Sequence, residues 1–207
     1  MKHILVANAK GGSGKTTLAT NLAGYLASTS DKVMLADLDR QQSATQWLKR
    51  RPTEAPMIHT LQSAGKLTNT YDWMVTDSPA GLRDEKLADA VKDADIVIVP
   101  IQPSAFDIGA AADFLDVLHQ EKAIRKQKTF VALVGSRVNS RTHAAVGLAE
   151  FMDDTGFPVL AYLRNSQVYT AAAEQGLSIF DMRPSLVAQD IEQWSVLLDW
   201  IHNTHQE

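Results

Sequence analysis

The fold is decided by one short stretch, Lys10-Gly11-Gly12-Ser13-Gly14-Lys15-Thr16-Thr17. It follows an apolar run at residues 4–7 and precedes a run at 16–27 in which leucine and alanine recur at helical spacing. Glycines let backbone N–H groups converge on an anion, and the N-terminus of the next helix adds a partial positive charge. A strand, a glycine-rich turn and a helix in this order predict a phosphate-binding loop over residues 11–17. In such a loop Lys15 reaches the β- and γ-phosphates and the Thr16 hydroxyl ligates Mg²⁺.

Further apolar runs predict buried strands. They lie at residues 33–38, 73–76, 96–101 and 130–134, and helical patterns lie at 110–120 and 144–153. Strands that alternate with helices indicate βαβ units. The chain has no internal repeat and no linker rich in Pro, Gly or Ser. We therefore expect one α/β domain over residues 1–207, with a doubly wound, mostly parallel sheet and helices on both faces, as in P-loop NTPases.

Composition narrows the class of protein. The 207 residues carry 20 Lys and Arg against 24 Asp and Glu, and 45% are hydrophobic, as in an ordinary globular protein. There is no cysteine, which excludes disulfide frameworks, thiolate zinc sites and cysteine-held iron–sulfur clusters. The apolar runs have the length of strands, so no membrane-spanning segment is predicted, and no secretory signal is recognisable. We expect a cytoplasmic protein.

Carboxylates follow two of the predicted strands. Asp37 and Asp39 lie two residues apart at the end of the strand at 33–38, so they project on the same side of an extended segment. Asp77 directly follows the strand at 73–76, which is the Walker B arrangement of an acid that holds Mg²⁺, usually through water. The carboxyl ends of parallel strands border the crevice where ligands bind. All three acids are therefore candidates for the nucleotide site.

The loop departs from the general P-loop pattern in one informative way. Ala9 stands where that pattern has glycine, and Lys10 immediately precedes the glycine pair. This form resembles the deviant Walker A motif of the ParA/MinD family of ATPases. The resemblance implies that Lys10 crosses a nucleotide-sandwich dimer to the partner's phosphates, that Asp39 positions the attacking water, and that Asp37 supports the metal shell. The expected catalytic residues are Lys10, Lys15 and Asp39, and the expected metal residues are Thr16, Asp37 and Asp77.

Two later segments also resemble this family. Residues 100–104, Pro-Ile-Gln-Pro-Ser, match a segment that the resemblance places near the dimer interface, although termination of a strand and N-capping of a helix by Ser104 explain the same residues. After the strand at 130–134, relatives similar to MinD often have an Asn–Arg pair that contacts adenine. Here the pair is Ser136-Arg137, and Asn139 lies three residues further on. Ser136 and Arg137 are the expected contacts on the base side, and adenine itself is implied by the family.

Basic residues concentrate between residues 122 and 141. This segment has a charge of +6, because it holds no acid, and it leaves −10 for the rest of the chain. The six residues are Lys122, Arg125, Lys126, Lys128, Arg137 and Arg141. The resemblance implies that the ATP-bound dimer binds DNA without sequence preference, and this segment, joined by Arg164 and Arg183, is the candidate surface. The alternative is an ordinary solvated helix end and loop.

The last amphipathic stretch distinguishes among relatives. Between residues 185 and 207, apolar residues recur at helical spacing, with four acids and no Lys or Arg. Helices that bind membrane surfaces need basic polar faces, so we expect core packing here and no membrane anchor. His202 and His205 lack a surrounding set of ligands and are expected to be tail residues.

The resemblance therefore implies a Mg²⁺-dependent ATPase that binds ATP and ADP, forms a homodimer with ATP, binds DNA and is stimulated by a ParB-like partner during plasmid or chromosome segregation. Because the loop begins at residue 10, the resemblance is to the small ParA class, which acts on the nucleoid in the cytoplasm. One alternative is the positioning of a protein cargo, such as a chemoreceptor cluster or carboxysome, through a cargo adaptor. Another is a P-loop metabolic synthetase, for which no substrate pocket is recognisable in the sequence.

Overall fold

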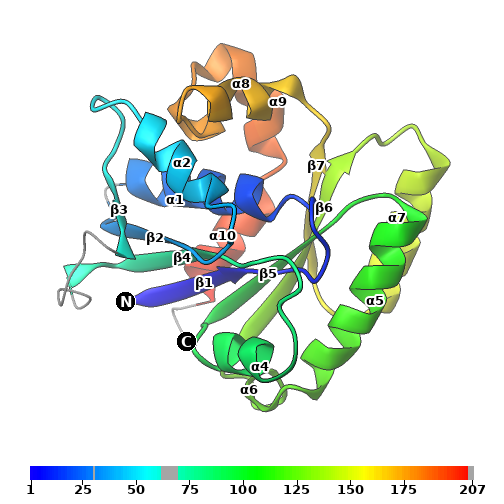
Figure 1. The fold of residues 1–207 in the computed structure, drawn as a ribbon. Coiled ribbons are helices and arrows are strands. Elements are labelled where there is room, and N and C mark those ends of the chain that lie inside the picture. Colours follow the sequence, from blue (N-terminus) through cyan, green and yellow to red (C-terminus); the bar gives the residue numbers. More distant parts are fainter. Residues whose placement is uncertain (30, 62–69, 205–207) are drawn as a thin grey trace.

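A seven-stranded parallel sheet forms the centre of the protein (Figure 1). The computed structural model describes residues 1–29, 31–61 and 70–204. The strands are β1 (Lys2–Val6), β2 (Val33–Asp37), β3 (Ile58–Thr60), β4 (Trp73–Asp77), β5 (Ile96–Ile101), β6 (Phe130–Val138) and β7 (Val159–Arg164). Their order in the sheet is β3-β2-β4-β1-β5-β6-β7, and every neighbouring pair is parallel. The carboxyl ends of β1, β2 and β4 therefore lie side by side at one edge of the sheet.

Helices cover both faces of the sheet. On one face lie α1 (Lys15–Ser28), α2 (Ser43–Arg50), α8 (Gln167–Glu174), the 3₁₀ turn η2 (Ile179–Asp181), α9 (Pro184–Glu192) and α10 (Ser195–Asn203). On the other face lie α4 (Asp84–Lys92), α5 (Ala105–Gln120), α6 (Lys122–Arg125) and α7 (His143–Asp154). Each layer buries its own hydrophobic cluster against the sheet. The predicted doubly wound α/β fold is confirmed.

The central strands are apolar throughout because both of their faces are covered. All six residues of β5 are buried, as expected for a strand with helices on each side. The five predicted strands are all present, although β6 continues four residues beyond the predicted end at 134. The sequence analysis missed β3 and β7, which are the two edge strands of the sheet.

The C-terminal stretch packs into the core as predicted, but as two helices. Helix α9 ends at Glu192 and α10 begins at Ser195, and the Trp194 side chain between them is fully buried. His202 is not a loose tail residue, because its ring lies 5.8 Å from the ring of Tyr25 and its Nε2 lies 3.3 Å from the Tyr25 hydroxyl. His205 lies outside the described residues. None of the helices in the described part of the chain has the length and apolar character needed to cross a membrane.

Candidate nucleotide site

The glycine loop connects β1 to α1 and forms one wall of an open cavity. Gly12 and Gly14 have positive φ angles of 77° and 104°, a conformation that glycine adopts without a steric penalty. No side chain caps the N-terminus of α1, so its first backbone N–H groups are available to a ligand. The cavity has a volume of about 430 Å³, and its lining includes the glycine loop, residues 39–41 after β2, and Pro79 and Ala80 after β4. This geometry suits an anionic ligand.

Lys15 lies across the base of the loop. Lys15 is 6% exposed, and its Nζ donates a hydrogen bond to the carbonyl oxygen of Lys10 at 2.9 Å. Burial lowers the pKa of the Lys15 ammonium, while the charges of Asp77 and Asp39 oppose that shift. The ammonium group therefore lies between the loop backbone and two acids, where phosphate oxygens can replace the carbonyl as its acceptor.

Asp77 is the most buried acid of the site. Asp77 has no exposed surface, its Oδ2 accepts a hydrogen bond from the Thr16 hydroxyl at 2.7 Å, and its Oδ1 has no hydrogen-bond partner among the described residues. Burial raises the pKa of Asp77 to about 7, helped by the charges of Asp37 and Asp39 and opposed by the Thr16 hydrogen bond and by Lys15. An unpartnered buried carboxylate oxygen is costly, and a hard cation is the ligand that its chemistry fits.

The donor set at Asp77 fits Mg²⁺ bound together with a nucleotide. Among the described residues, no group of three or more His, Asp or Glu side chains is arranged to hold a metal ion. Mg²⁺ often keeps waters and uses only one or two protein groups together with phosphate oxygens. Thr16 and Asp77 are such a pair, and the metal ion would depend on the phosphates for its remaining ligands.

Asp37 and Asp39 organise the loop after β2. Asp37 Oδ2 accepts a hydrogen bond from the backbone N–H of Thr45 at 2.8 Å, and its Oδ1 accepts one from Asp39 at 3.1 Å. Asp39 accepts hydrogen bonds from the N–H groups of Gln41 at 2.9 Å and Ala80 at 3.2 Å. Asp39 thus ties the loop after β2 to the loop after β4. Asp39 lines the phosphate cavity, whereas Asp37 lies opposite Asp77 on the neighbouring strand, and its metal role stays a prediction.

Lys10 is paired with an acid that the sequence did not point to, Asp107 of α5. Its Nζ lies 2.5 Å from Asp107 Oδ2, and the side chains are 35% and 8% exposed. Ser104 caps α5 as predicted, since its hydroxyl accepts the N–H of Asp107, and it also donates to the Asp107 carboxylate. The Asn8 carboxamide accepts the Lys10 N–H and donates to the Pro100 carbonyl. The segment at 100–104 therefore packs directly against the glycine loop.

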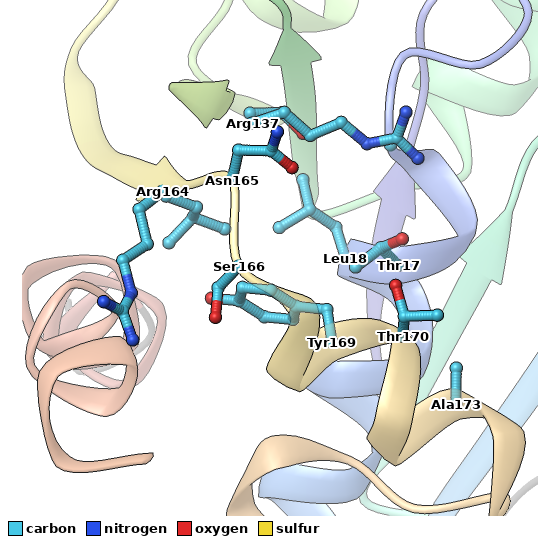
Figure 2. A pocket seen from close by; sticks show the side chains of 12 residues that line it. Thr17, Leu18, Arg137, Arg164, Asn165, Ser166, Tyr169, Thr170 and Ala173 are labelled. Atoms are coloured by element: carbon cyan, nitrogen blue, oxygen red, sulfur yellow. The ribbon is translucent and has the colours of Figure 1, made fainter. Parts of the chain in front are cut away.

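A second cavity continues from the phosphate cavity toward α8 (Figure 2). It has a volume of about 280 Å³ and shares Gly14, Thr17 and Arg137 with the phosphate cavity. Its other lining residues are Leu18, Ser136, Leu163, Arg164, Asn165, Ser166, Tyr169, Thr170 and Ala173. Apolar walls with a few polar groups are typical of a site for a small planar ligand. Both Ser136 and Arg137 border this cavity, whereas Asn139 lines a different one.

Asn165 and Tyr169 belong to this second cavity and were not identified from the sequence. In Figure 2 the Asn165 carboxamide lies between Arg137 and Leu18. The Tyr169 hydroxyl accepts a hydrogen bond from Trp194 Nε1 at 2.9 Å, and burial raises the pKa of Tyr169 to about 12. An Asn–Ser pair after an edge strand is too common a pattern to mark a binding site.

The basic segment at 122–141 is divided between the two ends of β6. Lys122, Arg125, Lys126 and Lys128 are exposed at the amino end of β6, and Arg137 and Arg141 are exposed near its carboxyl end. The nine residues of β6 separate the two groups by about 26 Å. The candidate basic surface therefore spans both ends of β6, and its role in DNA binding stays a prediction.

Arg164 is also unavailable as a free cation. Its guanidinium donates to both carboxylate oxygens of Asp190, at 2.8 and 2.7 Å, and to the side chain of Gln189 at 2.6 Å. The pairing with Asp190 raises the pKa of Arg164. Arg164 therefore joins β7 to α9, and it could contact DNA only by giving up this pair.

Comparison with known proteins agrees with this geometry. The family described as the CobQ/CobB/MinD/ParA nucleotide binding domain matches residues 4–179. The Maintenance of carboxysome distribution protein A of Gloeobacter kilaueensis is 31% identical over 192 residues, which are 87% of this chain and 84% of that protein. Protein ParA of Rhizobium radiobacter is 25% identical over 197 residues, covering 88% and 87% of the two chains.

The fold has close counterparts among solved structures. The septum site-determining protein MinD from Pyrococcus horikoshii, complexed with Mg-ADP, superposes with a TM-score of 0.73 at 17% identity, over 100% of this chain and 99% of that one. The family match covers residues 4–179. These residues include the phosphate loop and the acids at the ends of β2 and β4. This chain belongs to the CobQ/CobB/MinD/ParA family of nucleotide-binding domains.

Proposed function

We propose that the protein is a Mg²⁺-dependent ATPase that hydrolyses ATP to ADP and phosphate. One observation carries this proposal: the carboxylate of Asp77 is fully buried, and while one oxygen accepts from the Thr16 hydroxyl, the other has no partner in the part of the chain that the structure describes. In this proposal Thr16 and Asp77 hold Mg²⁺, and Asp37 supports them from the next strand. When bound, Mg²⁺ would neutralise charge on the β- and γ-phosphates.

The residues of the chain divide the remaining work. Lys15 and the backbone N–H groups of residues 11–17 bind the phosphates, and Asp39, fixed by two backbone hydrogen bonds, orients the attacking water. Lys10 reaches the phosphates of a second protomer, so that ATP holds a dimer together. Positioning and charge stabilisation are sufficient for phosphoryl transfer, because the transition state is loose and negatively charged.

The second cavity is proposed to hold the adenine base. Support comes from its continuity with the phosphate cavity through Gly14, Thr17 and Arg137. Ser136 and Arg137, on the side toward the glycine loop, would border the base where it joins the sugar and phosphates. Solved structures with a similar fold include complexes with ATP, AMPPNP and Mg-ADP, which supports an adenine nucleotide.

We propose that ATP turnover positions a cargo along DNA in the cytoplasm. The first candidate is segregation of plasmid or chromosomal DNA, with non-specific DNA binding and stimulation by a ParB-like partner. The similarity to Protein ParA supports this candidate. The second is the distribution of a protein cargo through an adaptor. The names of two relatives, the carboxysome distribution proteins of Gloeobacter kilaueensis and Halothiobacillus neapolitanus, favour this second candidate.

The catalytic proposal is tested by steady-state ATP hydrolysis with Mg²⁺ or with EDTA. Lys15→Ala is expected to abolish nucleotide binding, and Asp39→Ala to retain an ATP-bound dimer with little turnover. Lys10→Ala is expected to bind ATP without dimerising. ATP hydrolysis by Lys15→Ala at the wild-type rate would refute the assignment of the site. An ATP-dependent dimer of Lys10→Ala would refute the role of Lys10.

The cargo proposals are separated by binding measurements. Co-sedimentation with DNA in the presence of ATP, and loss of it with ADP, is expected if the ATP dimer uses DNA as its track. Equal binding with both nucleotides, or none with either, would overturn that part of the proposal while leaving the ATPase intact. Saturation of ATP turnover by a small metabolite instead would favour a synthetase.

A further inference from the structure

Residues 100–107, which end β5 and begin α5, run beside the glycine loop. Parallel pairing of β1 with β5 brings the carboxyl ends of both strands to the same edge of the sheet. Three side-chain contacts then join the two segments, although at least 90 residues separate the partners in sequence. Two of these contacts are made by the carboxamides of Asn8 and Gln102, and we name this pair of side chains the carboxamide clamp. The third is the ion pair of Lys10 with Asp107.

Asn8 holds the chain where it leaves β1. It is 1% exposed, and both ends of its carboxamide make hydrogen bonds. Its Nδ2 donates to the Pro100 carbonyl at 2.7 Å, and its Oδ1 accepts from the N–H of Lys10 at 2.9 Å. A buried amide that is hydrogen-bonded at both ends favours one conformation of the surrounding backbone. The first residues of the loop are therefore fixed to the end of β5 before any ligand binds.

Gln102 holds the middle of the loop. It is half-buried, and its Nε2 donates a hydrogen bond to the Gly12 carbonyl at 2.5 Å. Gly12 lines the phosphate cavity, whereas Gln102 is not part of that lining. The Gln102 amide therefore reaches the loop from outside the cavity and leaves the cavity open to a ligand.

The hydrogen bond from Gln102 sets the direction of one peptide unit of the loop. Because a peptide unit is planar and trans, the N–H of Ser13 points away from the Gly12 carbonyl. Among the described residues, no atom accepts a hydrogen bond from the Ser13 N–H. Packing against Gly12 does not hold this unit, since a Cβ built on Gly12 would find no neighbouring atom within 4 Å. The Ser13 N–H is thus an available donor whose direction depends on Gln102.

We propose that Gln102 is a positioning residue for phosphate binding, with Asn8 as the other half of the carboxamide clamp. By holding the Gly12 carbonyl, Gln102 keeps the Ser13 N–H ready for a phosphate oxygen, so that less of the loop must be ordered when a ligand binds. A glycine loop of this kind cradles the α- and β-phosphates, so the effect is the same for nucleoside diphosphates and triphosphates. The binding step rests on the nucleotide site itself, whereas the effect on ATP turnover rests on the proposed function.

Gln102→Met tests this proposal on the full chain, because methionine has a similar length and cannot donate a hydrogen bond. Titration of fluorescent ADP should show a dissociation constant about three- to tenfold higher than that of the wild type, the range expected for one lost hydrogen bond. Fluorescent ATP, titrated in an Asp39→Ala background to prevent turnover, should show the same factor. In steady-state hydrolysis the KM for ATP should rise while kcat stays at the wild-type value, because ground state and transition state lose the same contact.

Two further variants and one stability measurement make the result specific. Gln120→Met makes the same replacement at an exposed position at the other end of α5, and it should leave both dissociation constants unchanged. Gln102→Glu keeps the shape of the side chain but replaces the donor by a charged acceptor, so it should weaken ADP binding more than Gln102→Met does. Urea unfolding without nucleotide should give the same midpoint for Gln102→Met and the wild type, because water can replace the lost partner at this half-buried contact.

Three outcomes would overturn the proposal. Wild-type affinity of Gln102→Met for ADP would show that the amide does not position the loop. A loss confined to ATP would place Gln102 against the γ-phosphate or a second protomer instead. A urea midpoint that falls together with the affinity would make the amide a general support of the fold. Because ADP binding needs no turnover, a wild type that binds ADP without hydrolysing ATP would contradict the proposed function and leave the test of Gln102 intact.

Discussion

Replacing Asp107 by Asn should strengthen the ATP-dependent dimer. In the described structure Lys10 Nζ lies 2.5 Å from the Asp107 carboxylate. If Lys10 is to reach the phosphates of a second protomer, it must leave Asp107 first. Asparagine keeps the shape of the side chain and the hydrogen bond between the backbone N–H of residue 107 and Ser104, but it removes the charge that holds the lysine.

The size of the effect follows from burial. The Lys10 side chain is 35% exposed, so solvent screens the pair, whereas Asp107 is only 8% exposed. We therefore take about 1 kcal/mol for each pair, the upper end of the range for exposed ion pairs. A symmetric dimer breaks two pairs, which gives about 2 kcal/mol or roughly a 30-fold lower dissociation constant for the Asp107→Asn dimer.

Sedimentation velocity with ATP measures this change directly. The variants are compared in an Asp39→Ala background, so that turnover does not consume the nucleotide during the run. Asp113→Asn, on the same helix, is the matched control and should leave the dissociation constant unchanged. In the Lys10→Ala background, Asp107→Asn should have no effect. A dimer of Asp107→Asn that is weaker than the wild type, or equally strong, would refute the reasoning.

Three further predictions concern the loop, the core and the response to pH. Gly14→Ala adds a Cβ about 2.5 Å from the Ser136 hydroxyl, at a residue with a φ of 104°. The affinity for fluorescent ATP should therefore fall at least tenfold. The control Gly109→Ala, which has open space around the added Cβ, should not change that affinity. Asp181→Ala leaves the buried guanidinium of Arg51 without its ion pair. It should lower the free energy of unfolding in urea by about 3 to 5 kcal/mol. The double replacement Arg51→Met/Asp181→Leu, which leaves no unpaired charge, should lower it by less. Burial lowers the pKa of His3, so below about pH 6.5 the folded state binds fewer protons than the unfolded state. The free energy of unfolding is therefore highest above that pH, and it falls below it by at most about 1.4 kcal/mol per pH unit. His3→Gln should flatten that dependence in thermal unfolding at pH 5 to 7, and an unchanged slope would contradict the assignment.

The central strands were predictable because burial on both faces makes them apolar throughout. β5 is the clearest example, since its predicted and observed bounds agree. β3 has only three residues, and β7 alternates between buried and half-buried positions. Each of these strands pairs with a neighbour on one side alone, so local hydrophobicity gives a weak signal. Their positions follow from the sheet and not from their own sequences.

The same reasoning explains which parts of the site were predictable. Asp37 and Asp77 follow apolar strands, and parallel pairing aligns the carboxyl ends of those strands, with Asp37 directly opposite Asp77. The contact between Lys10 and Asp107 is different in kind, because 97 residues separate the two in sequence. It depends on how the segment at 100–104 packs against the glycine loop, and no periodicity in the chain encodes that packing.

Charge summed along the sequence is a poor guide to charge on a surface. The cations at 122–128 and those at 137–141 lie at opposite ends of β6, about 26 Å apart. At physiological salt the Debye length is about 8 Å, so each group acts on a polyanion independently of the other.

The pair at the carboxyl end lies beside the nucleotide cavities, and Arg137 lines two of them. ATP-dependent DNA contacts are therefore expected at the carboxyl end, and the alternative is that the amino end provides them once ATP has joined two protomers. Replacing Lys126 and Lys128 by Glu separates these two cases in the co-sedimentation assay: loss of ATP-dependent binding in that variant would show that the amino end of β6 provides the contact.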